Sequence, residues 1–275
     1  MFEGSKYAYY GMYLVGFAIM MIVNLRTHKR YELTKKTAVV FTLITYAAGV
    51  CGAMIMGDWY SDVAAKYDAG FSKVAIFGAV IFTPLFMTGV ALLAGKSWRR
   101  IMDLLAPGIF IILACAKFGC FMAGCCPGRE CSFGVYNPIL ELTVFPSQLF
   151  ESITMAFVVA FCFYYAIKSK KCTSGSVYPV TAAIYSVTRF CWEFMRYYPS
   201  DEVRHLVFGL SFWQFWCLIT ILVSIIWLVL LRWEKMMQLE QKYYGAHAAF
   251  IKRILERNKK NITHHNKNKK KYQKK

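Results

Sequence analysis

The sequence predicts an all-α membrane protein with seven transmembrane helices, an N-terminus outside the cell and a cytoplasmic C-terminus. Of the 275 residues, 57% are hydrophobic and 17% are charged, whereas a soluble domain has about 45–50% apolar and about 25% charged residues. Apolar runs of roughly the 20 residues that a spanning helix needs recur along the chain. Clusters of Lys and Arg separate alternate pairs of these runs, as expected for a protein with several spans.

Seven apolar runs are long enough to be predicted as spans. They cover residues 7–24, 38–57, 74–95, 101–125, 147–167, 177–195 and 206–231. The intervening loops are short and no repeat of fixed period is present. We therefore expect one membrane domain over residues 1–232, followed by a basic tail over residues 233–275.

The cations in the loops predict the orientation of the helices. The first, third and fifth loops hold the clusters Arg26, Lys29, Arg30, Lys35, Lys36; Lys96, Arg99, Arg100; and Lys168, Lys170, Lys171. Since cytoplasmic loops carry the excess of Lys and Arg, these loops and the tail are expected in the cytoplasm, in a multi-pass protein of the plasma membrane. The net charge of +18 then fits a basic tail that is attracted to anionic lipid. Nucleic acid is not an expected partner.

Charged residues within spans are expensive and indicate functional sites. The fourth span contains Lys117, and the sixth contains Arg189 and Glu193. Together with Arg196, the latter two follow the spacing i, i+4, i+7, which places all three on one helix face. The fifth span begins with a polar pair on one face, Gln148 and Glu151.

The predicted orientation brings these side chains to one depth. The fourth and sixth spans run outward and carry their charges late, whereas the fifth runs inward and carries its polar residues early. We therefore expect a polar site in the outer half of the bilayer, where cations suit the phosphate of a lipid. The alternative is that Lys117 and the Arg–Glu pairs only extend their charges to the membrane boundary.

The stretch over residues 115–131 contains five cysteines, and it allows three interpretations. Its pattern C-x4-C-C-x4-C is not a standard zinc spacing, so no metal is predicted. Outside the cytosol, Cys126 and Cys131 can form a disulfide across the Pro-Gly turn. Alternatively, Cys120 or Cys125 is a reactive thiolate stabilised by Lys117 or Arg129.

At these positions the chain resembles the prolipoprotein diacylglyceryl transferase family. The matching stretches are residues 9–17, 103–107, 117–129, 145–151 and 185–196. They occur in the family's order and cover the membrane domain but not the tail. The seven spans with an outside N-terminus also agree with the family.

The resemblance implies an enzyme that moves the diacylglyceryl group of phosphatidylglycerol to the lipobox cysteine thiol of a prolipoprotein. The expected partners are this phospholipid and the signal-peptide region of the prolipoprotein, and no cofactor is implied. We expect catalytic roles for Arg189, Lys117, Cys120 and Cys125. Phospholipid-binding roles are expected for Tyr10, Asp103, Gly119, Gly128, Arg129, Gln148, Glu151, Glu193 and Arg196.

The chain departs from the family at six polar positions. Phe77 and Phe145 stand where the family has histidine, Lys117 and Ala53 where it has arginine, Cys120 where it has asparagine and Cys125 where it has glutamate. A cysteine or His205 is the candidate replacement for the lost base. Two alternatives follow: a phospholipid-dependent transferase with a cysteine nucleophile and another acceptor, or a non-catalytic lipid-binding membrane protein.

Overall fold

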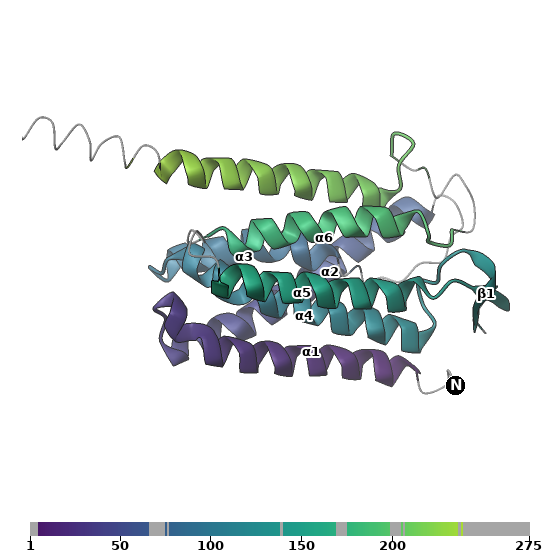
Figure 1. Ribbon diagram of the computed structural model, residues 1–275, viewed down its shortest axis with the longest axis horizontal. Helices are drawn as coiled ribbons and strands as arrows, with labels where there is room; N and C mark the ends of the chain where they lie inside the picture. The colour runs from purple at the N-terminus through teal and green to yellow at the C-terminus, as the bar shows by residue number, and fades with distance from the viewer. Residues whose placement is uncertain are drawn as a thin grey trace, which may run out of the picture. The chain divides into compact units, whose positions relative to one another are not determined.

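Seven α-helices make up most of the residues that the computed structural model describes, which are 5–65, 75, 77–137, 140–168, 175–198, 205, 207–235 and 238. They are α1 (Ser5–Thr27), α2 (Lys35–Ala65), α3 (Phe77–Leu93), α4 (Trp98–Ala123), α5 (Ser147–Lys168), α6 (Val177–Glu193) and a last helix, Phe212–Lys235 (Figure 1). A short 3-10 turn, η1 (His28–Tyr31), follows α1.

Each of the seven predicted spans corresponds to one of these helices. Five of the helices, namely α1, α2, α4, α5 and the last, are long and apolar enough to cross a membrane. The other two, α3 and α6, have 17 residues each. At a rise of about 1.5 Å per residue they extend about 26 Å, slightly less than a hydrocarbon core of about 30 Å.

The chain divides into two units, Met1–Leu228 and Val229–Lys275, and the helices α1 to α6 belong to the first. Within it, α4 is the central helix, with contacts to α1, α2, α3, α5 and α6. Buried residues lie on every face of α4, from Ile101 to Cys120, as expected for a helix surrounded by others. By contrast, α1 and α5 expose large apolar side chains such as Leu14 and Phe157, which suits contact with lipid. The predicted basic tail falls almost entirely outside the described residues.

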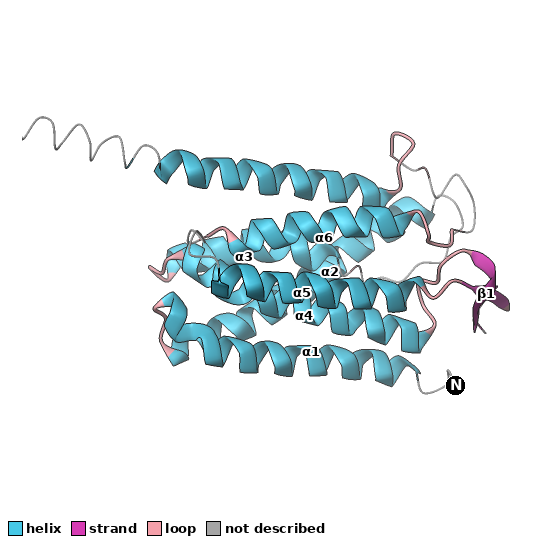
Figure 2. Cartoon of the chain, viewed as in Figure 1, coloured by secondary structure: helices cyan, strands magenta, loops and turns pink. Residues whose placement is uncertain are grey.

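The helical fold is confirmed in the described residues, which are mostly helical, but a two-stranded antiparallel hairpin that the sequence did not predict follows α4. It consists of β1 (Glu130–Asn137) and β2 (Leu142–Val144), with Tyr136 opposite Thr143 (Figure 2). The pairing is irregular between Glu130 and Val135. These strands are short and interrupted by this irregularity, so their β-forming residues do not show the regular alternation that predicts a strand.

A short backbone segment, Pro127 to Arg129, ties three helix ends together. The N–H of Gly128 donates to the carbonyl of Phe145, just before α5, at 2.9 Å. The N–H of Arg129 donates to Met195, just after α6, also at 2.9 Å, and Tyr197 donates back to Pro127 at 3.1 Å. The end of α4, the start of α5 and the end of α6 are therefore held in a fixed register.

Two glycines allow α2 and α3 to pack backbone to backbone. A Cβ placed on Gly78 of α3 would lie 2.1 Å from the carbonyl oxygen of Gly52 in α2. Small residues at helix crossings are typical of membrane proteins, because close approach maximises van der Waals contact between helices.

We predict that Gly78→Ala destabilises the protein by about 1–3 kcal/mol, since the added methyl forces α2 and α3 apart. Thermal unfolding in detergent measures the effect. The matched control is Gly89→Ala in the same helix, where nothing lies within 4 Å of an added Cβ; it should change stability by less than about 1 kcal/mol. Equal behaviour of the two variants would contradict the packing described here.

Candidate functional site

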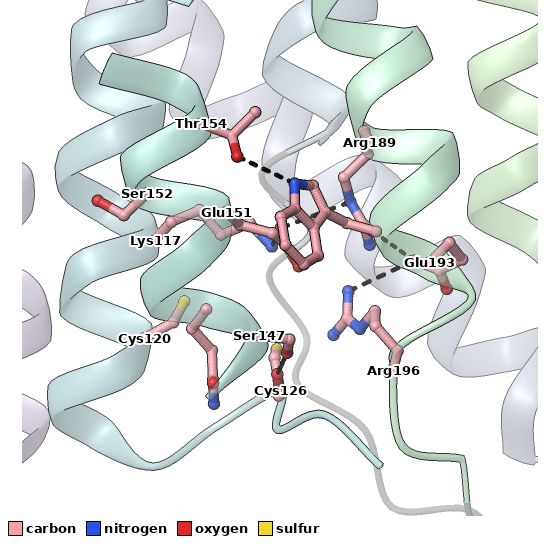
Figure 3. Close-up of polar contacts among 12 residues, drawn as sticks. Lys117, Cys120, Cys126, Ser147, Glu151, Ser152, Thr154, Arg189, Glu193 and Arg196 are labelled. Atoms are coloured by element: carbon pink, nitrogen blue, oxygen red, sulfur yellow. Dashed lines mark hydrogen bonds and ion pairs between the residues drawn. The ribbon is translucent and has the colours of Figure 1, made fainter. Parts of the chain in front are cut away.

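Five charged side chains, from three helices and the loop after α6, meet in a cluster, called here the charge cluster. Lys117 comes from α4, Glu151 from α5, Arg189 and Glu193 from α6, and Arg196 from the loop that follows α6 (Figure 3). The first four are at most 7% exposed, and the Arg196 side chain is 13% exposed. Helices that are separate in sequence thus bury their charges at one place.

The two carboxylates bridge the three cations. Glu151 Oε2 pairs with Lys117 Nζ and also lies 3.8 Å from Arg189 Nε. Glu193 Oε2 pairs with Arg189 Nη1 and lies 3.9 Å from Arg196 Nη1. Glu193 Oε1 accepts a hydrogen bond from the hydroxyl of Tyr198. Three cations face two carboxylates, so the cluster carries one excess positive charge.

The α-helical period explains why α6 supplies two members of the cluster. Arg189 and Glu193 are four residues apart and therefore lie on one face. The segment around Gly128 fixes the end of α6 against the ends of α4 and α5, which holds Arg196 near the same face. Burial of this pattern is tolerated only because each charge has a partner of opposite sign.

A small cavity adjoins the charge cluster, and one carboxylate oxygen beside it is unpartnered. The cavity has a volume of about 10 Å³ and is lined by Leu113, Lys117, Glu151, Thr154, Met155, Tyr185, Thr188, Arg189 and Trp192. That is room for about one water molecule. Within the described residues, Glu151 Oε1 is buried and has no hydrogen-bond partner, so an acceptor is available to a polar ligand group.

A second, larger cavity of about 480 Å³ lies between α1, α2, α3 and α4. Its lining is mostly apolar and aromatic, and includes Tyr10, Tyr13, Ala53 and Ile112. Leu113 lines both cavities. An apolar space of the size that ligand pockets have therefore meets the small cavity at Leu113.

The cysteine stretch folds so that three of its thiols meet. The Sγ atoms of Cys120, Cys125 and Cys126 all lie within 4.8 Å of one another. In this structure Cys126 and Cys131, the pair considered for a disulfide, are both unbridged thiols. Cys131 lies in β1 and is not part of this group, which we call the thiol cluster.

The electrostatic surroundings of Cys126 differ from those of Cys125. Hydrogen bonds from Cys120 and Cys125, with the positive charges of Arg196 and Lys117, hold the pKa of Cys126 well below its usual value. For Cys125, a hydrogen bond with Cys120 lowers the pKa, but one with Cys126 and burial raise it to about 12. The surroundings therefore stabilise a thiolate at Cys126 more than at Cys125, and a reactive Cys120 or Cys125 stays a prediction.

The remaining predicted residues support the site by packing and backbone contacts. Gln148 is buried and its Nε2 donates to the carbonyl of Cys125 at 2.7 Å. Gly119 lets α4 approach α1, since an added Cβ would lie 3.3 Å from the backbone of Tyr9. Gly128 belongs to the segment that ties the helix ends together. Arg129 is exposed, and the structure does not bring it into the charge cluster.

Asp103 was expected to bind phospholipid, and the structure places it elsewhere. It is 14 residues before Lys117 on α4, which is about 21 Å along the helix. Its carboxylate accepts the N–H groups of Gly175 at 2.5 Å and Val177 at 2.9 Å. Asp103 therefore caps the start of α6, where a negative charge also complements the helix dipole.

The positions that depart from the family pattern are filled by packed side chains. Phe77 is buried, with its ring 5.7 Å from that of Tyr185, and Tyr185 lines the small cavity. Phe145 stacks on Phe150 at 5.0 Å. The other candidate base, His205, is exposed and contacts Gly209 O at 2.8 Å through Nδ1.

Comparison with known proteins identifies the family. A family model described as "Prolipoprotein diacylglyceryl transferase" matches residues 3–230. The chain belongs to this family. A phosphatidylglycerol–prolipoprotein diacylglyceryl transferase 2 of Clostridium perfringens is 30% identical over 181 residues, which are 59% of this chain and 68% of that protein.

Two further relatives are named phosphatidylglycerol–prolipoprotein diacylglyceryl transferase. The protein from Clostridium tetani is 32% identical over 139 residues, covering 47% of this chain and 53% of its own length. The protein from Legionella pneumophila, strain Lens, is 27% identical over 221 residues, which are 74% of this chain and 84% of that protein. Members of this transferase family are membrane-bound, in agreement with the five long apolar helices.

The sequence did not indicate Cys126, Tyr198 or Trp192 as residues of the site. Trp192 Nε1 donates to Thr154 at 3.1 Å and thereby links α6 to α5 beside the small cavity. Tyr198 lies two residues after Arg196. Its closeness in sequence to a charged residue at a helix end could have indicated that it belongs to the site. Cys126 was part of the recognised motif, but spacing alone did not distinguish it from Cys125.

We predict that Glu151→Gln destabilises the protein by about 3–5 kcal/mol, because Lys117 and Arg189 then lose the carboxylate between them. The double variant Lys117→Met, Glu151→Gln should recover part of the loss, since it also removes a buried charge. Thermal unfolding in detergent measures both.

The control for this prediction is the exposed pair Arg100–Glu32, whose Nη1 and Oε2 lie 2.5 Å apart with side chains 44% and 72% exposed. Glu32→Gln should cost less than about 1 kcal/mol, because water screens exposed charges. A Glu151→Gln variant as stable as Glu32→Gln would argue against a buried, interdependent network.

Proposed function

We propose that the protein transfers the diacylglyceryl group of phosphatidylglycerol to the lipobox cysteine of a prolipoprotein, at the outer leaflet of the plasma membrane. The observation that carries the proposal is the charge cluster beside an apolar cavity, in a chain of this transferase family. An amphipathic donor needs both: charge for its phosphate and apolar space for its acyl chains. Family membership supplies the class of reaction.

The charge cluster suits the headgroup. A phosphodiester carries one negative charge, which matches the one excess positive charge of Lys117, Arg189 and Arg196 over Glu151 and Glu193. Guanidinium groups bind phosphate oxygens through paired N–H donors, so Arg189 and Arg196 are the proposed phosphate ligands. The unpartnered Glu151 Oε1 is the proposed acceptor for a hydroxyl of the glycerol headgroup.

The larger cavity is the proposed site of the acyl chains. It has a volume of about 480 Å³ and is lined by Tyr10 and other residues from α1, α2, α3 and α4. Leu113 also lines the small cavity beside Lys117 and Arg189. A lipid with its phosphate at the cluster would therefore have apolar space for its tails within reach.

In the proposed reaction the acceptor thiol loses its proton, which the departing glycerol phosphate takes up, and its sulfur attacks the glycerol carbon that carries the phosphate ester. A C–S bond forms as the C–O bond breaks, and glycerol phosphate leaves with the bonding electrons. Cations positioned at the leaving phosphate stabilise the charge that develops there. Arg189 and Lys117 are proposed for this role, and Cys120 and Cys125 line the same region in place of the family's asparagine and glutamate.

The proposal includes seven crossings with the N-terminus outside and the tail over residues 233–275 in the cytoplasm. The cationic loops support this orientation. In it, the ends of α4 and α6 and the start of α5 lie toward the outer surface. The charge cluster then lies on the side of the membrane where outer-leaflet lipid and a translocated prolipoprotein are found.

The test is transfer of labelled diacylglycerol from phosphatidylglycerol to a lipobox peptide by the full-length protein in liposomes. We expect transfer, and we expect Arg189→Ala to lower its rate by about 100-fold or more, the typical loss when a transition-state donor is removed. Arg189→Lys should retain part of the rate, because lysine keeps the positive charge but lacks the paired N–H donors of the planar guanidinium group.

The matched control is Phe157→Ala on the exposed face of α5, which should transfer at the wild-type rate. If the wild-type protein transferred nothing where a relative is active, or if Arg189→Ala had no effect, the proposal would be wrong. Mass spectrometry of the protein itself adds a check, because a lipid adduct on one of its own cysteines would indicate the alternative mechanism with a cysteine nucleophile.

A further inference from the structure

The thiol cluster is not required by the transfer reaction, since the acceptor thiol belongs to the prolipoprotein. Yet the chain brings three sulfur atoms, from Cys120, Cys125 and Cys126, within 4.8 Å of one another. Cys120 is buried, and the other two are partly buried. Three thiols converging at one point are a donor set for a soft metal ion.

We propose that Cys120, Cys125 and Cys126 bind one Cu(I) ion in a three-coordinate trithiolate site. A metal–sulfur distance of about 2.3 Å places the three sulfurs of such a site about 4 Å apart. The sulfurs already lie within 4.8 Å of one another, so rotation of the side chains brings them to bonding distance. On binding, each thiol gives up its proton to solvent and its sulfur coordinates the ion.

The composition of the cluster favours Cu(I) over other metals. Zinc in structural sites takes four ligands in a tetrahedron, and within the described residues no histidine or carboxylate joins the three cysteines. Magnesium and calcium require oxygen ligands. Thiolates favour Cu(I) because it is a soft ion, and three-coordinate binding is an ordinary geometry for it.

The neighbouring charges suit the complex. One Cu(I) ion and three thiolates carry a net charge of −2, which needs compensation in a site of low polarity. The positive charges of Arg196 and Lys117 act on Cys126, and Figure 3 shows both residues in the same region as Cys120 and Cys126. The cations that would repel a bare metal ion therefore stabilise the anionic trithiolate.

The backbone holds the cysteines in place before any metal arrives. Gly124 and Cys126 both have left-handed backbone conformations, with φ of 67° and 58°. For a residue with a side chain this conformation is uncommon and marks functional sites. The carbonyl of Cys125 accepts from Gln148 at 2.7 Å, and that of Cys126 accepts from Ser147 Oγ at 3.4 Å. The start of α5 thus fixes the turn that directs Cys126 toward Cys120.

The test is binding of Cu(I) to the full-length, reduced protein in detergent without oxygen, in competition with bicinchoninate. We expect one ion per chain, and X-ray absorption should give three sulfur neighbours at about 2.3 Å. Cys120→Ser and Cys126→Ser should each weaken binding more than about 100-fold, since they remove a ligand. Cys131→Ser is the matched control, from the same sequence motif but outside the thiol cluster, and should bind like wild type.

A second measurement needs no variant. Cu(I) should protect Cys120, Cys125 and Cys126 of the wild-type protein from alkylation, while Cys131 is alkylated as before. The proposal is overturned if Cu(I) does not compete with bicinchoninate, if the site holds four ligands with zinc and rejects Cu(I), or if protection falls equally on Cys131. Because binding is measured without phosphatidylglycerol or peptide, this test does not depend on the proposed transfer activity.

Discussion

The pairing of buried charge across three helices is the constraint on which the rest of this structure depends. Lys117, Glu151, Arg189 and Glu193 are all buried, and any one of them left without its partner would cost several kcal/mol. The pairing holds only if α4, α5 and α6 keep a fixed axial register. The backbone hydrogen bonds of Gly128 and Arg129 set that register at one end, and Asp103 anchors the start of α6 at the other.

The same arrangement separates two environments that an amphipathic lipid needs. The charge cluster lies between α4, α5 and α6, whereas the large cavity lies between α1, α2, α3 and α4, so α4 is the wall that both share. At four of the six positions where the sequence is expected to depart from the family, this chain has aromatic rings or thiols. Phe77 and Phe145 fill space, but the cysteines form a cluster of their own beside the cations.

The helices and the charge cluster were predictable because both follow from strong, local sequence signals. Long apolar runs give helices, and a helical period together with the alternating orientation of spans brings Lys117, Glu151 and Arg189 to one depth. The capping role of Asp103 was not predictable, because its partners Gly175 and Val177 are more than 70 residues away in sequence. The hairpin, the cavity and the meeting of Cys126 with Cys120 depend on tertiary packing and left-handed turns, which spacing does not encode.

The central claim is that one phospholipid occupies both environments at once. Photo-crosslinking with phosphatidylglycerol that carries a diazirine in an acyl chain tests it directly, with peptide mapping of the adducts on the full-length protein in nanodiscs. The account predicts crosslinks on cavity residues such as Tyr13, Ala53 and Ile112, and their loss in Arg189→Ala, which removes the proposed phosphate ligand. Crosslinks confined to exposed residues such as Phe157 and Tyr164, unchanged by Arg189→Ala, would contradict it.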